Sequence, residues 1–168
     1  MKSKRVSLPL LNCTRGDPKM SDTDLIKLYS AKILALAADI PHLDRLDAPD
    51  ATVKRRAPLC GSTVTVDIKM TGDQISAYGQ DVKACALGQA AASVVGANII
   101  GCTRDQVEAA RDALLAMLKS DGPTPPAPFD GLEVLRPARD YKNRHASIML
   151  TLEATLEAMD AAANSACA

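Results

Sequence analysis

The sequence predicts an α+β fold: a three-stranded antiparallel sheet covered by helices, with an N-terminal helix plus C-terminal helices. Two observations predict it. Strand-like segments follow one another between residues 51 and 84 with only short turns between them, and helical patterns lie on both sides, at residues 21–40 and after residue 85. Grouped strands favour an antiparallel meander with one covered face, whereas a parallel sheet would alternate strands with helices.

Length and composition indicate one domain. The chain has 168 residues, 47% of them hydrophobic and 24% charged, which is enough for a single buried core. We expect this domain to span residues 20–163, with a flexible extension at 1–19 and a frayed tail at 164–168. The formal net charge of zero argues against nucleic-acid binding. We expect no membrane partner either, because no apolar run reaches the roughly 18 residues of a membrane span.

The first helix is predicted at residues 21–40, where Ile26, Tyr29, Ile33, Leu36 and Ile40 recur at helical spacing before Pro41. The strands follow. Residues 51–61 are expected to be extended, and residues 62–70 alternate strictly between a core face and a solvent face. The core face carries Val64, Val66, Ile68 and Met70, and the solvent face carries Thr65, Asp67 and Lys69. A turn at 71–73 leads to a third strand at 74–84, bent around Gly79.

Helices fill the rest of the chain. A helix rich in small residues is predicted from Cys85 to near Gly101, and a capping box of Thr103 and Gln106 starts the next one. That helix buries Val107, Ala110, Leu114 and Met117. It ends at 120–123, and the proline-rich connector 122–131 is expected to contain no helix. The last helix begins near Asn143, with a stripe of His145, Met149, Leu152 and Leu156.

Five cysteines occur, at positions 13, 60, 85, 102 and 167. The odd number, and an N-terminal apolar patch too short for a signal peptide, favour free or metal-bound thiols in a cytoplasmic protein.

Cys60, Cys85 and His145 are the candidate site residues, because each lies at an element boundary and boundary residues can converge at one end of a sheet. Cys85 begins a helix, whose unpaired N–H groups lower the pKa of a thiol there. Gly61 allows a close backbone approach to a bound ion. Spacing by itself leaves three roles open for Cys85: a small core residue, a nucleophile or a metal ligand.

Residues 57–93, "APLCGSTVTVDIKMTGDQISAYGQDVKACALGQAAAS", resemble the core of the NifU/IscU/SufU-type iron–sulfur cluster assembly scaffolds. That family has a P-x-C-G-D turn, two strands and a G-C-x-x-x-x-A-S-x-S helix start. The matching residues are Pro58, Cys60, Gly61 and Cys85, and the pair Ala92 and Ser93 resembles the family's Ala-Ser, two residues further from Cys85 than in the motif. "RHASIM" at 144–149 resembles the H-C-S-I-L start of the family's last helix, and the resemblance covers roughly residues 22–160.

The resemblance implies a SufE/NifU-like fold and a scaffold rather than an enzyme. Such a scaffold receives iron and sulfur, builds a [2Fe–2S] cluster and passes it to apo-protein acceptors, with a cysteine desulfurase as the sulfur donor. By resemblance, Cys60, Cys85 and His145 would be the metal ligands, for iron or a [2Fe–2S] cluster, with zinc as the alternative metal.

Two departures from the family pattern leave the ligand set open. Ser62 stands at the position of the family's aspartate, and Ala146 at the position of its third cysteine. Ser62, Gly61 and Asp81 are therefore additional site candidates. Cys102, glutathione or another copy of the chain are further sources of a ligand, and a homo-oligomer stays open.

Two other functions remain as alternatives. One is a zinc-bound sulfur-acceptor or regulatory module that acts on a cysteine desulfurase without carrying a cluster. The other is a thiol enzyme that uses Cys85 with His145 as base. The basic residues Arg136, Arg139, Lys142 and Arg144 fit either a solvated loop or a docking patch for an acidic partner.

Overall fold

The computed structural model describes residues 29–167 and confirms the α+β class. Residues 1–28, which include the predicted extension and the start of the predicted first helix, lie outside the described part. The elements are α2 (Ala31–Ala38), β1 (Ala51–Arg56), β2 (Thr63–Thr71), β3 (Gln74–Lys83), α3 (Ala86–Asn98), α4 (Arg104–Ser120), the 3₁₀ helix η1 (Asp130–Asp140) and α5 (Lys142–Ala166). Among these residues, no helix is both long and apolar enough to cross a membrane.

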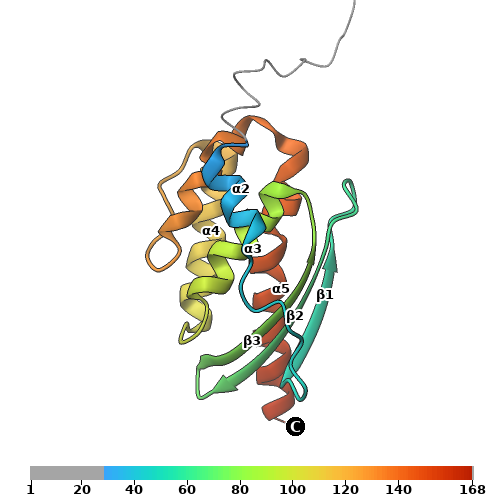
Figure 1. Cartoon of the computed structure of the whole chain (residues 1–168). Coiled ribbons are helices and arrows are strands. Elements are labelled where there is room, and N and C mark those ends of the chain that lie inside the picture. Colours follow the sequence, from blue (N-terminus) through green and yellow to red (C-terminus); the bar gives the residue numbers. More distant parts are fainter. Residues whose placement is uncertain (1–28, 168) are drawn as a thin grey trace, which may run out of the picture.

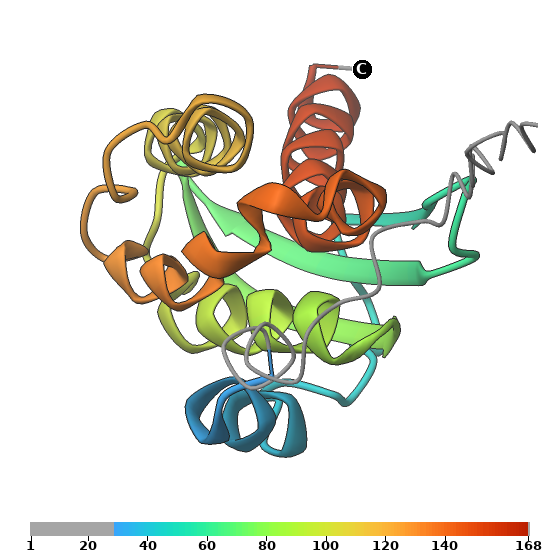
Figure 2. The same cartoon turned by 90° about the horizontal axis from the view of Figure 1, so that it is seen from above.

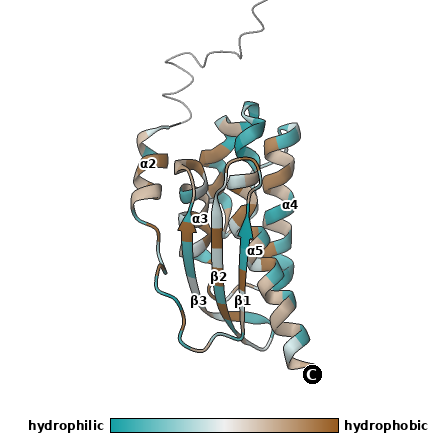
Figure 3. Cartoon of the chain, turned by 90° about the vertical axis from the view of Figure 1, so that its right-hand side faces the viewer, coloured by the Kyte–Doolittle hydropathy of each residue, from teal (hydrophilic) through white to brown (hydrophobic). Residues whose placement is uncertain are grey.

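The sheet is the predicted antiparallel meander, with strand order β1-β2-β3. In its register Val53 lies opposite Val66, and Val66 lies opposite Gln80. The helices α3, α4 and α5 gather behind the sheet, and α5 crosses the length of its inner face (Figures 1 and 3). Val64, Val66 and Ile68 point to this face and are buried, as the alternation of β2 predicts.

The outer face of the sheet differs from the prediction. Thr65 and Asp67 were expected in solvent, but both are buried, Asp67 completely. The cause is the irregular segment 39–50, which runs along β3 and over β2: the N–H of Gln80 donates to the carbonyl of His42 over 2.8 Å. A Cβ on Gly79 would lie 2.5 Å from the carbonyl oxygen of Asp44. Position 79 therefore requires glycine, because any side chain would collide with the backbone of the segment 39–50.

Asp67 holds the covering segment in place. Its carboxylate accepts hydrogen bonds from Arg45 Nε (2.5 Å) and Nη2 (3.0 Å), and from the backbone N–H of Leu46 (3.1 Å). The hydroxyl of Thr52 on β1 donates a fourth, over 2.6 Å. Burial acts to raise the pKa of Asp67, but these hydrogen bonds and the charge of Arg45 outweigh it and hold the pKa below its ordinary value.

Within the described residues, the helix predicted at 21–40 is confirmed only over α2, Ala31–Ala38, and its predicted start at 21–28 lies outside the described part. Ser30 caps α2 through its side chain, Ile33 is buried, and the helix ends at Ala38, two residues before Ile40. The capping box of α4 is confirmed, since Thr103 Oγ1 accepts from Gln106 N and Gln106 Oε1 accepts from Thr103 N. The predicted buried face of α4 is confirmed as well.

One element was missed. Residues 130–140 form η1, where Leu132, Leu135 and Ala138 recur every third residue and are buried, the period of a 3₁₀ helix. The view in Figure 2 shows this segment passing between α4 and α5. Arg136 and Arg139 on η1 both pair with Asp121 at the end of α4.

The last helix begins as predicted and runs to Ala166. It thus extends into the segment 164–168. The fraying of that segment and the domain boundaries at residues 20 and 163 stay predictions. Met149, Leu152 and Leu156 on α5 are buried in the core that all of the described elements share.

Candidate thiol site

The loop between β1 and β2, the start of α3 and the start of α5 meet at one end of the molecule (Figure 1). A hollow lies there, lined by Cys60, Gly61, Ser62, Lys83, Ala84, Cys85 and Arg144. The structure thus brings Cys60 and Cys85 together, as the sequence predicts. Their approach follows from the meander, because the strand that leaves the Cys60 turn and the strand that leads to Cys85 are neighbours.

Cys60 lies on a tight turn and is exposed. The N–H of Gly61 donates to the carbonyl of Ala57 over 3.0 Å, and the N–H of Ala57 donates to the carbonyl of Ser62 over 2.8 Å. Gly61 has φ +70°, a conformation that side chains other than glycine rarely adopt. Gly61 is therefore required by the turn that presents the Cys60 thiol.

Two buried serine hydroxyls link the thiols. Cys60 Sγ lies 3.2 Å from Ser62 Oγ, Ser62 Oγ lies 3.1 Å from Ser147 Oγ, and Ser147 Oγ lies 3.5 Å from Cys85 Sγ. Ser147 is on the first turns of α5 and is only 1% exposed. Ser147 lies in the segment 144–149 that resembles the family motif, and its contacts with Ser62 and Cys85 appear only in the structure.

The surroundings of Cys60 favour its thiolate form. Hydrogen bonds from the side chain and backbone of Ser62, with a smaller contribution from the positive charge of Arg144, lower the pKa of Cys60. Cys85 is the N-cap residue of α3, which confirms its predicted place at a helix start. Its side chain is half-buried. A thiolate is the form that binds soft metal ions or attacks a sulfur atom.

His145 does not join this hollow. Its Nε2 lies 3.0 Å from the carbonyl oxygen of Ala138 and 3.1 Å from that of Arg139, so Nε2 carries a proton and donates it to η1. The imidazole lies in a separate hollow beside Lys119, Arg139 and Lys142. Within residues 29–167 no three His, Cys, Asp or Glu side chains are grouped closely enough to hold a metal ion.

The other candidate donors lie elsewhere too. Asp81 on β3 forms a loose ion pair with Lys83, at 3.8 Å. Cys102 is buried, its Sγ donates to the carbonyl of Asn98, and burial raises the pKa of its thiol. Cys102 therefore has the environment of a structural cysteine.

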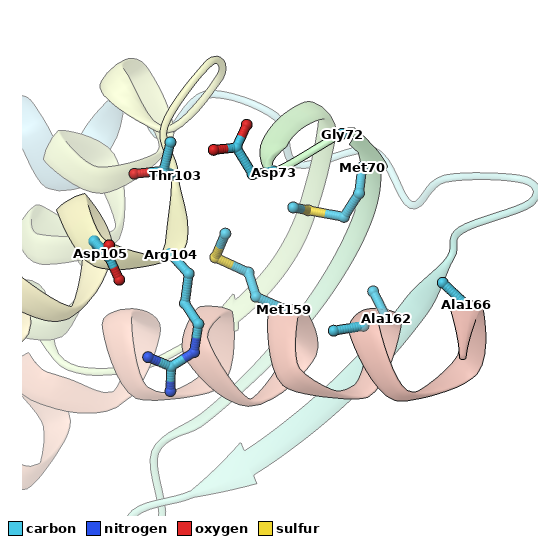
Figure 4. Close-up of a pocket in the computed structure, with 10 residues that line it drawn as sticks. Met70, Gly72, Asp73, Thr103, Arg104, Asp105, Met159, Ala162 and Ala166 are labelled. Atoms are coloured by element: carbon cyan, nitrogen blue, oxygen red, sulfur yellow. The ribbon is translucent and has the colours of Figure 1, made fainter. Parts of the chain in front are cut away.

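Another hollow lies at the opposite end of the molecule, between the β2–β3 turn and the end of α5. Figure 4 shows Met70, Met159 and the alanines of α5 along it, with Asp73 and Arg104 at its edge. No cysteine or histidine lines it, so thiol chemistry belongs to the first hollow.

The fold and the paired thiols define the class: a NifU/IscU/SufU-type α+β domain, with cysteines after the first strand and before the helix that follows the third. The crystal structure of a nitrogen-fixing NifU-like protein (N-terminal) from Brucella abortus matches this chain with a TM-score of 0.82 and 41% sequence identity, over 84% of this chain and 98% of that one. This chain belongs to the NifU-like (N-terminal) family.

Two more distant structures show the same fold. One is a hypothetical protein, with a TM-score of 0.72 and 21% identity over 80% of this chain and 98% of that one. The other is a putative iron–sulfur cluster assembly scaffold protein for the SUF system from Fervidobacterium islandicum AW-1, with a TM-score of 0.70 and 18% identity over the same shares. No family model matches the chain, and no curated protein matches it.

Proposed function

We propose that this protein is a scaffold for iron–sulfur cluster assembly, which holds iron or a [2Fe–2S] cluster as cargo through Cys60 and Cys85. The observation that carries the proposal is the convergence of these two thiols in one hollow, in a chain of the NifU-like family. The protein is then a carrier rather than an enzyme. A cysteine desulfurase supplies its sulfur, and apo-proteins receive the cluster in the cytoplasm, where thiols stay reduced.

The hollow suits such cargo in two respects. Thiolates are the soft ligands that iron–sulfur clusters prefer. A cluster with thiolate ligands is an anion, and Lys83 and Arg144 supply positive charge beside it. His145 as a ligand stays a prediction, which requires its ring to leave the carbonyls of Ala138 and Arg139.

Reconstitution under argon with ferric iron and sulfide tests the proposal. After removal of small molecules, the wild-type protein should keep the visible absorption of a [2Fe–2S] cluster. Cys60→Ala and Cys85→Ala should each lose most of it, because each removes one of the thiolates in the hollow. Cys167→Ala is the matched control, since Cys167 is an exposed free cysteine at the other end of α5. A wild-type protein without this absorption, or a Cys85→Ala variant with unchanged absorption, would refute the scaffold.

A second function, sulfur acceptance without a cluster, is favoured by the exposure and lowered pKa of Cys60. The Cys60 thiolate would attack the outer sulfur of a desulfurase persulfide, the desulfurase thiolate would leave, and Cys60 would carry the persulfide. Resident zinc fits this site poorly, because a closed zinc site needs four ligands and the hollow offers two cysteines.

Incubation with a cysteine desulfurase and free cysteine tests sulfur acceptance. We expect the intact mass of the wild type and of Cys85→Ala to rise by one sulfur atom, and that of Cys60→Ala to stay unchanged. Cyanide should remove the added sulfur, since it cleaves persulfides and leaves thioethers intact. A sulfur atom found on Cys85 alone would contradict the assignment of Cys60 as acceptor.

A further inference from the structure

The hollow between the β2–β3 turn and the end of α5 continues into a neighbouring hollow, and the two together form one groove, the end groove. The hollows have volumes of about 370 and 400 Å³ and share Met70, Gly72, Ala162 and Ala166. Most of the lining is apolar, with methionines beside the small side chains of α5 (Figure 4). Small side chains leave room, so the end groove can accept branched apolar side chains such as leucine.

The rim of the end groove is acidic. Asp73 in the β2–β3 turn and Asp105 at the start of α4 are exposed, and neither forms an ion pair within residues 29–167. Asp50 adds a third exposed carboxylate. Arg104, the cation of the lining, is already paired with two further carboxylates. The end groove therefore suits an apolar segment that carries positive charge.

The chain itself carries such a segment ahead of the described residues. Residues 1–19 contain five lysines and arginines and one aspartate. Four apolar side chains are grouped in the same stretch, at Val6, Leu8, Leu10 and Leu11. This combination of charge and apolar side chains is the complement of the end groove.

We propose that residues 4–11 dock in the end groove of their own chain, with the leucines against the methionines and alanines and with Lys4 and Arg5 beside the acidic rim. Docking removes apolar surface of both the segment and the groove from water, and the opposite charges fix the place of the segment. Because segment and groove belong to one chain, the contact is intramolecular and needs only a modest intrinsic affinity.

The chain is long enough to make this contact. α2 begins at the end of the molecule that carries the thiol hollow, and the end groove lies at the other end (Figure 1). The 25 residues of α5 measure roughly 37 Å along the helix axis, which approximates the distance to be spanned. The chain from Leu11 to Tyr29 reaches at most about 60 Å. If residues 21–28 are helical, as predicted, it still reaches roughly 45 Å.

Two native cysteines can report on the docking. Cys13 lies two residues after Leu11, and the exposed Cys167 follows Ala166 of the end groove. Diamide, which takes up two electrons and two protons per disulfide formed, should therefore join Cys13 to Cys167 within one chain when the full-length protein is dilute. Proteolysis without reduction, followed by mass spectrometry, identifies the linked peptides.

Cys60 is an internal competitor in this experiment. It is exposed, its pKa is lowered, and it lies at the end of the molecule where α2 begins. A segment that does not dock should therefore link Cys13 mainly to Cys60. The competition is best measured in full-length Cys85→Ala, because Cys60 then has no neighbouring thiol in its own hollow.

Two variants test the two components of the contact. Leu10→Ser, which removes an apolar side chain, should lower the yield of the Cys13–Cys167 disulfide at least threefold, whereas Thr14→Ser beside the same cysteine should not. Asp73→Lys should lower it by a similar factor, because it places a positive charge beside Lys4 and Arg5. Asp130→Lys is its matched control, since Asp130 is an exposed aspartate on η1, outside the end groove.

A Cys13–Cys60 disulfide in place of Cys13–Cys167 would overturn the docking, as would a yield that Leu10→Ser and Asp73→Lys leave unchanged. A Cys13–Cys167 disulfide found only between two chains would overturn the intramolecular contact and assign the segment to a second copy. These results do not depend on iron or sulfide, so they are independent of the reconstitution that tests the scaffold function.

Discussion

Asp67→Ala is expected to lower the free energy of unfolding by roughly 3 kcal/mol at neutral pH. Asp67 is fully buried and accepts hydrogen bonds from Arg45, Leu46 and Thr52. Alanine leaves these donors without an acceptor and opens a cavity under the segment 39–50. Urea unfolding followed by circular dichroism measures the change. A loss below about 1 kcal/mol would mean that the segment 39–50 is not held by this carboxylate.

Asp67→Asn separates the charge of this residue from its volume. The pKa of Asp67 is lowered in the folded protein, so its carboxylate stabilises the fold above the ordinary aspartate pKa of about 3.9. That stabilisation is lost as the pH falls through the lowered folded pKa. The stability difference between wild type and Asp67→Asn should therefore be full at pH 7 and shrink below about pH 4. A difference that does not change with pH would show that the contribution of Asp67 is steric.

Gly88→Ala should destabilise the protein by about 1–3 kcal/mol, although alanine is the better helix former by about 1 kcal/mol. Gly88 lies in the first turn of α3, against α5. A Cβ there would lie 2.5 Å from Ser147 Oγ, 2.9 Å from Ala84 Cβ and 3.1 Å from the carbonyl oxygen of Ser147. The added methyl must push Ser147 away from Cys85, so bound cluster should fall together with the melting temperature.

A double-mutant cycle with Ser147→Ala tests this contact. Because the nearest clash is with the Ser147 hydroxyl, Gly88→Ala should cost less in the Ser147→Ala background than in the wild type. If the changes in the free energy of unfolding caused by the two substitutions are strictly additive, the strain arises instead from the contact with Ala84 or with the backbone of α5. A stabilised Gly88→Ala variant would show that α5 moves freely enough to admit the methyl.

The part of the site that could be predicted from the sequence is the meeting of its two thiols, because that depends only on the order of the strands. Cys60 and Cys85 flank neighbouring strands of a meander, so their meeting follows from the strand pattern and short turns. The direction of His145 could not be predicted in this way. Side chains two residues apart on an α-helix point about 160° apart, so a helix that turns Ser147 into the hollow turns His145 away from it. The rotation of α5 is decided by its packing on β1, β2 and α3.

The sequence by itself determined the features that depend on near neighbours along the chain. These are the alternation of β2, the turn at Gly72, the capping box at Thr103 and the thiol at the start of α3. Only the tertiary structure decided the covered outer face of the sheet, the burial of Asp67 and the hydroxyl link through Ser147. The physical reason is that these features join groups 15 to 85 residues apart. Their free energy comes from desolvation and pairing that exist only once the chain has folded.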